Sequence, residues 1–288
     1  MATPRYSIPE LHSLIEQEES PLLVVEGYSD LRVLKWAFDL LDPPRNPLIL
    51  DVNSIEINIY PVWKSDHTPG NRDYVTELAR QLYGSDLESK VLCLIDADHD
   101  LINGNSKDSY TGNVALTDYP DIESYFASLV GITRYLKNIC TIQRFKPGKH
   151  AANIISIPYS TYVLRKVLYP MSTYSGWSDT WSKSITSTSD GLGFDMHQCA
   201  RKCLSGNNDA ASEAVLFAKD IMLKHPQADH VVHGHDFITS LSLSAYQATG
   251  NKAYLDYDVI FNSIRTEVGP SILHESNLFN TLKSHFAF

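Results

Sequence analysis

Acidic residues follow two apolar segments in the first third of the chain. Glu26 ends the apolar run Leu22 to Val25, and Asp96, Asp98 and Asp100 alternate in "LIDADHD" after a second apolar run. Crowded carboxylates repel one another unless a cation lies among them, and a site made only of oxygen ligands suits Mg²⁺ or Mn²⁺. The pattern therefore predicts a metal site in which Asp96 and Asp98 hold the ion. Asp100 is predicted to be a direct or water-mediated ligand, and Glu26 to bind a second ion or to transfer a proton.

A third acidic group lies in the segment "TDYPDIESYF" at residues 117–126, which contains Asp118, Asp121 and Glu123. Glu123 is predicted to be a further ligand of the metal ion, directly or through water. The alternative concerns Asp121, which would cap the start of a helix, because helix N-termini favour acidic side chains.

The segments that must position these acids alternate between strand and helix patterns. The predicted elements are a strand at 22–25, a helix at 29–41, a strand at 55–63, a helix at 71–84 and a strand at 90–98. This order indicates an α/β fold with an open, mostly parallel sheet flanked by helices, in which ligands bind beyond the carboxyl ends of the strands. Because residues two apart share one side of an extended segment, Asp96, Asp98 and Asp100 are expected on the same side.

The combination of these motifs resembles a known domain. An apolar strand that ends in Glu-Gly, a helix, and a later strand that ends in Asp-x-Asp-x-Asp resemble the TOPRIM domain of topoisomerases, bacterial primases and OLD-type nucleases. The segments "TDYPDIESYF" and "VVHGHDFITSLS" (231–242) are similar to those of the TOPRIM nuclease effectors of the PARIS antiphage defence system. The resemblance covers about the first 130 residues by motif and the remainder by general layout only.

This resemblance implies a metal-dependent endoribonuclease with Glu26, Asp96 and Asp98 as catalytic residues. Such a protein would act as a toxin in abortive infection, cleaving host tRNA after release from an ABC-type ATPase partner and working as a homodimer. Two alternatives stay open, an OLD-like DNA endonuclease and a non-catalytic subunit of the ATPase complex. The residues by themselves support only metal-assisted cleavage of a phosphate-bearing polymer, by water or by a ribose 2′-hydroxyl.

Charge is distributed unevenly along the chain. Residues 1–129 carry a net charge of −13, whereas residues 130–205 carry +7 and interleave their cations with aromatic side chains. This mixture suits RNA, whose phosphates attract cations and whose unstacked bases stack on aromatic rings. The predicted nucleic-acid-binding residues are Lys137, Arg144, Lys146, Lys149, Arg165 and Lys166. The alternative is a solvated basic surface, with at least half of the aromatic residues buried in the core.

The charge pattern and the motifs together suggest two domains. Residues 1–130 are expected to form the TOPRIM catalytic domain, and residues 131–288 a mainly helical region for substrate binding and assembly. Within the second region, residues 172–193 are rich in Ser, Thr and Gly, which predicts a long loop.

Histidines and cysteines of the second region could form a zinc site. His197, Cys199 and Cys203 lie close in sequence, as do His230, His233 and His235, but the thiols lack the paired spacing of most zinc sites. The simpler interpretation of "GHDFITSLS" is that Gly234 breaks the chain and Asp236 caps a helix.

The composition also indicates where the protein acts. No apolar run approaches the roughly 20 residues needed to cross a bilayer, and four cysteines at irregular spacing do not indicate a disulfide framework. These features predict a cytoplasmic protein without membrane contact.

Overall fold

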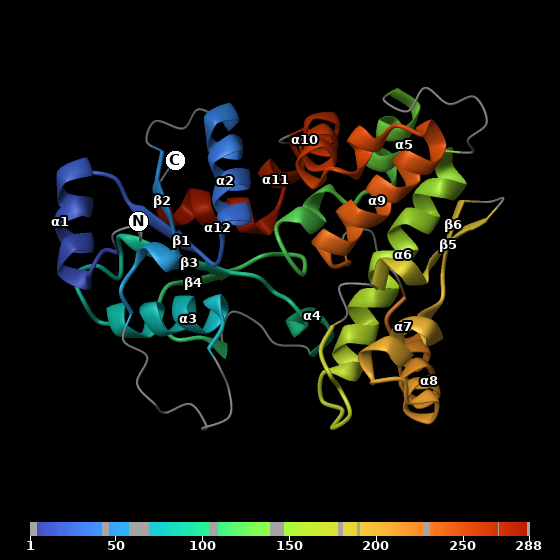
Figure 1. The fold of residues 1–288 in the computed structure, drawn as a ribbon. Helices are drawn as coiled ribbons and strands as arrows, with labels where there is room; N and C mark the ends of the chain where they lie inside the picture. The colour runs from blue at the N-terminus through green and yellow to red at the C-terminus, as the bar shows by residue number, and fades with distance from the viewer. Residues whose placement is uncertain are drawn as a thin grey trace. The chain divides into compact units, whose positions relative to one another are not determined.

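The computed structural model describes residues 5–41, 46–57, 69–103, 109–138, 147–177, 181–188, 191–226, 231–269 and 271–286. The chain forms two compact units, which are visible in Figure 1. The first contains Met1–Asp118 together with Pro270–Phe288, and the second contains Tyr119–Gly269.

The first unit is built on a four-stranded parallel sheet in the order β2-β1-β3-β4. Its strands are β1 (Leu22–Val25), β2 (Leu48–Asp51), β3 (Val91–Ile95) and β4 (Val114–Leu116). Leu22 lies beside Leu48 of β2 on one side and beside Val91 of β3 on the other. Strands β1 and β3 are apolar and buried along their whole length, as expected for central strands covered on both faces.

Helices cover both faces of this sheet (Figure 1). On one face, α1 (Ile8–Glu18) and α3 (Asn71–Leu82) pack their apolar side chains on alternate residues of β1 and β3. On the other face lie α2 (Tyr28–Leu41) and α12 (Asn277–Phe286), whose residues Phe38 and Phe279 have ring centroids 5.7 Å apart. The fold is therefore a mixed α/β structure, as the sequence predicted.

The C-terminal segment returns to the first unit through α11 (Ser271–His274) and α12. A carboxylate oxygen of Asp118, just beyond β4, accepts a hydrogen bond from the backbone N–H of Leu278 at 3.1 Å. The division of the chain thus differs from the boundary expected near residue 130. Residues 119–130 belong to the second unit, where their side chains pack. The ring centroids of Phe126 and Phe261, for example, lie 5.6 Å apart.

One predicted strand of the first unit was misplaced. The second strand is β2 at Leu48–Asp51, whereas residues 55–57 of the predicted strand 55–63 contain only an isolated bridge between Ile55 and Tyr6. The Asp51 side chain accepts the N–H of Asn53 and starts the short 3₁₀ helix η1 (Val52–Ser54), which ends the strand. The remainder of the predicted strand, from residue 58, lies outside the described residues.

The second unit is mainly helical. Its helices are α5 (Leu129–Asn138), α6 (Pro147–Leu168), α7 (Met196–Cys203), α8 (Asn208–Lys224), α9 (Gly234–Thr249) and α10 (Tyr257–Val268), with short 3₁₀ helices η3 (Glu123–Phe126), η4 (Trp181–Ser184) and η5 (Lys252–Leu255). The longest helix, α6, packs against α5, α8 and α9. None of the helices described in either unit is both long and apolar enough to span a membrane.

A β-hairpin replaces part of the predicted loop at 172–193. Strands β5 (Ile185–Thr188) and β6 (Gly191–Phe194) pair antiparallel, with Ile185 opposite Phe194. The prediction was wrong here because small polar residues concealed a short strand pair. Trp181, which is 7% exposed, anchors the hairpin through an edge-to-face contact with Phe194 at 6.3 Å.

Candidate functional site

The carboxyl ends of β1 and β3 adjoin, and they bring two of the predicted acids together. Glu26 follows β1 directly, and Asp96 follows β3. The Oε1 atom of Glu26 accepts a hydrogen bond from the backbone N–H of Asp96 at 2.8 Å. Residues 70 positions apart in the sequence are therefore fixed at the same edge of the sheet.

The chain beyond Asp96 is not extended, which corrects the expected alternation of the three aspartates. Strand β3 ends at Ile95, Asp98 has a left-handed backbone with φ of 42°, and Asp100 begins the short helix α4 (Asp100–Asn103). A left-handed φ is uncommon outside glycine, although Asp and Asn adopt it more readily than most residues. The backbone therefore turns at Asp98. The carboxylates of Asp98 and Asp100 both form hydrogen bonds with another residue.

That residue is Arg72, in the first turn of α3. Its Nη1 donates to the backbone oxygen of Asp96 and to Oδ2 of Asp98, each at 2.8 Å. Its Nη2 donates to Oδ2 of Asp100 and to the hydroxyl of Tyr110, and that hydroxyl donates to the same Asp100 oxygen at 2.8 Å. One guanidinium therefore bonds the backbone oxygen of Asp96 and the carboxylates of Asp98 and Asp100.

The position of Arg72 at this edge could have been predicted from the sequence, although the acidic motifs do not include it. In a βαβ unit the helix runs antiparallel to the strands, so the first turn of α3 lies at the carboxyl edge of the sheet. The segment "NRD" opens the predicted helix at 71–84. A basic residue at this position is therefore directed to the same edge as the strand-end acids.

The electrostatic environment changes the proton affinity of this site. Burial and the charge of Asp98 raise the pKa of Glu26 to about 7, although the Asp96 N–H and the Arg72 charge act to lower it. For Arg72, burial acts to lower the pKa, but the hydrogen bond to Tyr110 and the charges of Asp98 and Asp100 raise it above its ordinary value. Glu26 can therefore gain or lose a proton near neutral pH, while Arg72 stays charged.

The donor atoms are chemically suited to Mg²⁺ or Mn²⁺, since Glu26, Asp96, Asp98 and Asp100 offer only oxygen. The carboxylates of Asp98 and Asp100 are bonded to the guanidinium of Arg72. Within the ranges that the structure describes, no three His, Cys, Asp or Glu side chains are grouped closely enough to hold a metal ion. The residues therefore fit a divalent ion by chemistry, and their present geometry fits the arginine.

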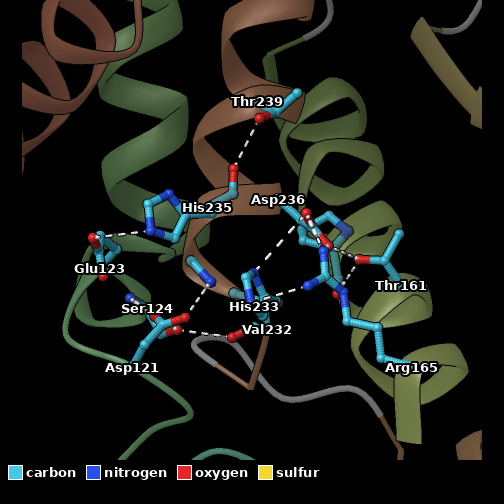
Figure 2. Close-up of polar contacts among 12 residues, drawn as sticks. Asp121, Glu123, Ser124, Thr161, Arg165, Val232, His233, His235, Asp236 and Thr239 are labelled. Atoms are coloured by element: carbon cyan, nitrogen blue, oxygen red, sulfur yellow. Dashed lines mark hydrogen bonds and ion pairs between the residues drawn. The ribbon is translucent and has the colours of Figure 1, made fainter. Parts of the chain in front are cut away.

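The predicted fifth ligand, Glu123, lies in the second unit, where its side chain is 2% exposed (Figure 2). The Tyr257 hydroxyl donates to Glu123 Oε1 at 3.3 Å, and His235 Nε2 lies 3.9 Å from the same oxygen. The role of Glu123 in metal binding stays a prediction.

Next to Glu123, Asp121 links two turns of the second unit. Its Oδ1 accepts the backbone N–H of Ser124 at 2.9 Å, and its Oδ2 accepts the N–H of Gly234, the first residue of α9, at 2.7 Å (Figure 2). Asp121 thus accepts backbone N–H groups at the start of η3 and of α9, although the N-cap residues of these helices are Ile122 and His233. Burial and the charge of Glu123 raise the pKa of Asp121 to about 7, against the hydrogen bonds from Ser124 and Gly234.

Asp236 does not cap α9, which corrects another expectation. The N-cap of α9 is His233, and the Asp236 side chain, 3% exposed, points to α6 (Figure 2). Both of its oxygens accept from Nη2 of Arg165 at 2.8 Å, and Oδ2 also accepts from the Thr161 hydroxyl at 2.6 Å. The Arg165 guanidinium stacks on the ring of Trp177 at 4.1 Å. A residue predicted to bind nucleic acid is therefore part of an internal ion pair.

The other predicted nucleic-acid-binding residues are found in different settings. Lys137 is exposed at the end of α5, and Lys166 is half-buried on α6. Arg144 and Lys146 lie outside the described residues, as does the side chain of Lys149. Of the eight described Tyr, Trp and Phe residues at 130–205, four are buried, as expected: Tyr135, Tyr159, Tyr162 and Trp181.

The cysteines considered for zinc lie on α7, one turn apart. The thiols of Cys199 and Cys203 are fully buried. His197 contacts the Ser212 hydroxyl at 3.1 Å. His230, from the other candidate group, lies outside the described residues.

No protein-family model matches the chain, and no curated protein matches it either. The assignment of a function therefore depends on the geometry of the strand-end site and on the motifs that resemble the TOPRIM domain.

Proposed function

We propose that the first unit is a TOPRIM-like nuclease domain that depends on a divalent metal ion. The contact between Glu26 Oε1 and the N–H of Asp96 carries the proposal, because it brings the acids that end β1 and β3 together. Ligand sites of parallel α/β sheets lie at this edge. Asp98 and Asp100 follow on the same loop and complete an acidic group at this edge.

In this proposal Asp96 and Asp98 hold Mg²⁺ or Mn²⁺, with Asp100 and Glu26 as further ligands. A divalent ion bound there would neutralise charge on the non-bridging oxygens of a phosphodiester and favour attack on phosphorus. Glu26, with its pKa near neutrality, is suited to hold or move a proton at its carboxylate.

For the substrate, we propose RNA, and specifically tRNA cleaved by an endoribonuclease toxin of an antiviral abortive-infection system. The basic, aromatic-rich composition of residues 130–205 and the exposed Lys137 support nucleic-acid binding. Control by an ABC-type ATPase partner and an active homodimer belong to the same proposal and derive from the resemblance alone.

The test is cleavage by the purified full chain of tRNA and of supercoiled plasmid, with Mg²⁺, with Mn²⁺ and with EDTA. We expect metal-dependent cuts in tRNA, and a loss of about a hundredfold or more in rate for Glu26→Gln. Asp86→Asn, an exposed acid of the same unit, is the matched control and should cleave normally. Circular dichroism would verify that each variant is folded.

The other functions give different results. Metal-dependent plasmid cleavage with intact tRNA would favour the DNA endonuclease. Equal cleavage by wild type and Glu26→Gln would reject the catalytic site, and no cleavage of either substrate would favour the non-catalytic subunit.

Substrate binding has a separate test. Replacing Lys146 and Lys149 by Glu should weaken tRNA binding and reduce its salt dependence by about two counterions, because each lost phosphate contact removes about one. The Mn²⁺ affinity should be unchanged, since neither lysine belongs to the acidic loop. Unaltered tRNA binding would remove the basic segment from the proposal.

A further inference from the structure

Arg72 donates hydrogen bonds to the carboxylates of Asp98 and Asp100, which follow Asp96 in the acidic loop. Its side chain is 24% exposed, and it bonds Asp98 and Asp100 through different nitrogens. A guanidinium offers five donors in a rigid planar fork, which allows one side chain to bridge two carboxylates. One positive charge of the chain therefore serves both carboxylates and balances the loop charge in part.

A guanidinium and a divalent ion cannot share these oxygens in their present positions. Mg²⁺ requires carboxylate oxygens at 2.0–2.1 Å in near-octahedral geometry, whereas the arginine nitrogens lie at hydrogen-bond distance from the same atoms. Two cations at such separations also repel each other. A metal ion that takes the Oδ2 atoms of both Asp98 and Asp100 therefore requires the arginine to withdraw.

The surroundings of Arg72 provide an entry for an ion and a contact that holds the arginine apart from the aspartates. The Asp98 side chain is 56% exposed, so an ion can reach it from solvent. Arg72 also contacts Tyr110, through the hydroxyl and across the ring at 5.7 Å from its centroid. These contacts can retain the guanidinium after it leaves the carboxylates.

We infer that Arg72 is an internal counter-ion that competes with the divalent metal ion for Asp98 and Asp100. The inference rests on the proposed metal-dependent function and adds a form of control to it. The site is held closed to metal by its own arginine, and metal binding releases the arginine. Arg72 is accordingly a positioning residue, which sets how readily the acidic loop accepts an ion.

The experiment measures Mn²⁺ binding to the full chain by titration calorimetry and by Mn²⁺ electron paramagnetic resonance. We expect Arg72→Gln to bind Mn²⁺ about tenfold more tightly than wild type, which corresponds to an arginine that occupies the carboxylates in about nine molecules of ten. Arg80→Gln is the matched control, because Arg80 lies on the same helix and pairs with Glu77 instead. Its Mn²⁺ affinity should equal that of wild type.

Melting temperature provides a second readout that does not depend on activity. In EDTA, Arg72→Gln should melt below wild type, because its carboxylates lose their counter-ion. Saturating Mn²⁺ should then raise its melting temperature by more than it raises that of wild type. If Arg72→Gln does not fold, Arg72→Lys retains a charge without the fork and should show a smaller rise in Mn²⁺ affinity.

The outcomes separate this inference from the proposed function. Mn²⁺ binding that is lost in Glu26→Gln but is equal or weaker in the Arg72 variants would overturn the inference and leave the metal site intact. If neither wild type nor the Arg72 variants bind Mn²⁺ through these acids, the proposed function fails, and the inference fails with it.

Discussion

Replacing Arg165 by Ala tests whether this residue stabilises the second unit or serves as a nucleic-acid contact. The Asp236 carboxylate is 3% exposed and receives three hydrogen bonds, two from Arg165 and one from Thr161. Burial raises the pKa of Asp236, and the Arg165 charge and the hydrogen bonds lower it. Nη2 of Arg165 contacts both oxygens of Asp236, so truncation of Arg165 would leave the buried carboxylate without its counter-ion.

The expected loss is large in relation to the stability of a domain. Removing one partner of a buried ion pair costs about 3–5 kcal/mol. The stacking of Arg165 on Trp177 adds about 1 kcal/mol, since the guanidinium lies 4.1 Å from the ring centroid and is mostly buried. We therefore expect Arg165→Ala to lower the free energy of unfolding by about 4–6 kcal/mol, compared with a total of about 5–15 kcal/mol for typical proteins.

The assay is urea unfolding followed by circular dichroism, with two further variants. The double replacement Arg165→Met with Asp236→Leu should recover most of the loss, because apolar residues of similar volume can replace a buried pair. Arg201→Ala removes an exposed arginine of α7 and should change the stability by no more than about 0.5 kcal/mol. A loss below 1 kcal/mol in Arg165→Ala, together with weaker tRNA binding, would refute the internal role and restore the sequence-based prediction.

Two further predictions concern the polar contacts around α9. A Cβ on Gly234 would lie 2.3 Å from Oδ1 of Asp121, so Gly234→Ala should cost about 3 kcal/mol in urea unfolding. Gly250→Ala, at the other end of α9 in open space with φ of 69°, should cost only about 1 kcal/mol, and equal losses would contradict the close-contact argument. The pKa of Asp121, about 7 when folded and about 3.9 when unfolded, predicts that stability is lost as pH rises from about 4 through 7. Asp121→Asn should be less stable at low pH but should show a weaker decline with pH, and parallel curves for the two proteins would reject the shift.

Much of the sheet could be predicted because its signals are local. The runs at 22–25 and 91–95 are apolar and bounded by residues that stop strands, and the helices α2 and α3 show the expected periodicity. Strand β2 was missed because its four residues "LILD" follow a proline-rich segment, whereas the alternation from residue 55 was longer. The hairpin β5–β6 was missed since its pairing depends on tertiary contacts such as that of Trp181 with Phe194.

The candidate site was predictable only where strand order decides it. The proximity of Glu26 and Asp96 follows from two adjacent parallel strands, and it was found. The geometry of Asp98 depends on a left-handed residue and on Arg72, which no spacing rule for acids contains. The pairing of Asp236 with Arg165 joins residues 71 positions apart on two helices, so a local capping rule gave the wrong result.

Asp236, Asp121 and the strand-end acids are compensated in three different ways, and the difference bears on where chemistry is proposed. Asp236 is paired with Arg165 and also accepts a hydrogen bond from Thr161, which suits a permanent structural pair. Asp121 receives hydrogen bonds from neutral groups, which suits a cap. At the strand ends, a single arginine bonds both Asp98 and Asp100. The pKa of Glu26, beside them, is raised to about 7 by burial and by the charge of Asp98. Here the carboxylates outnumber the single cation that the chain supplies. An added cation would therefore reduce their mutual repulsion. This imbalance supports the metal site proposed at the strand-end acids.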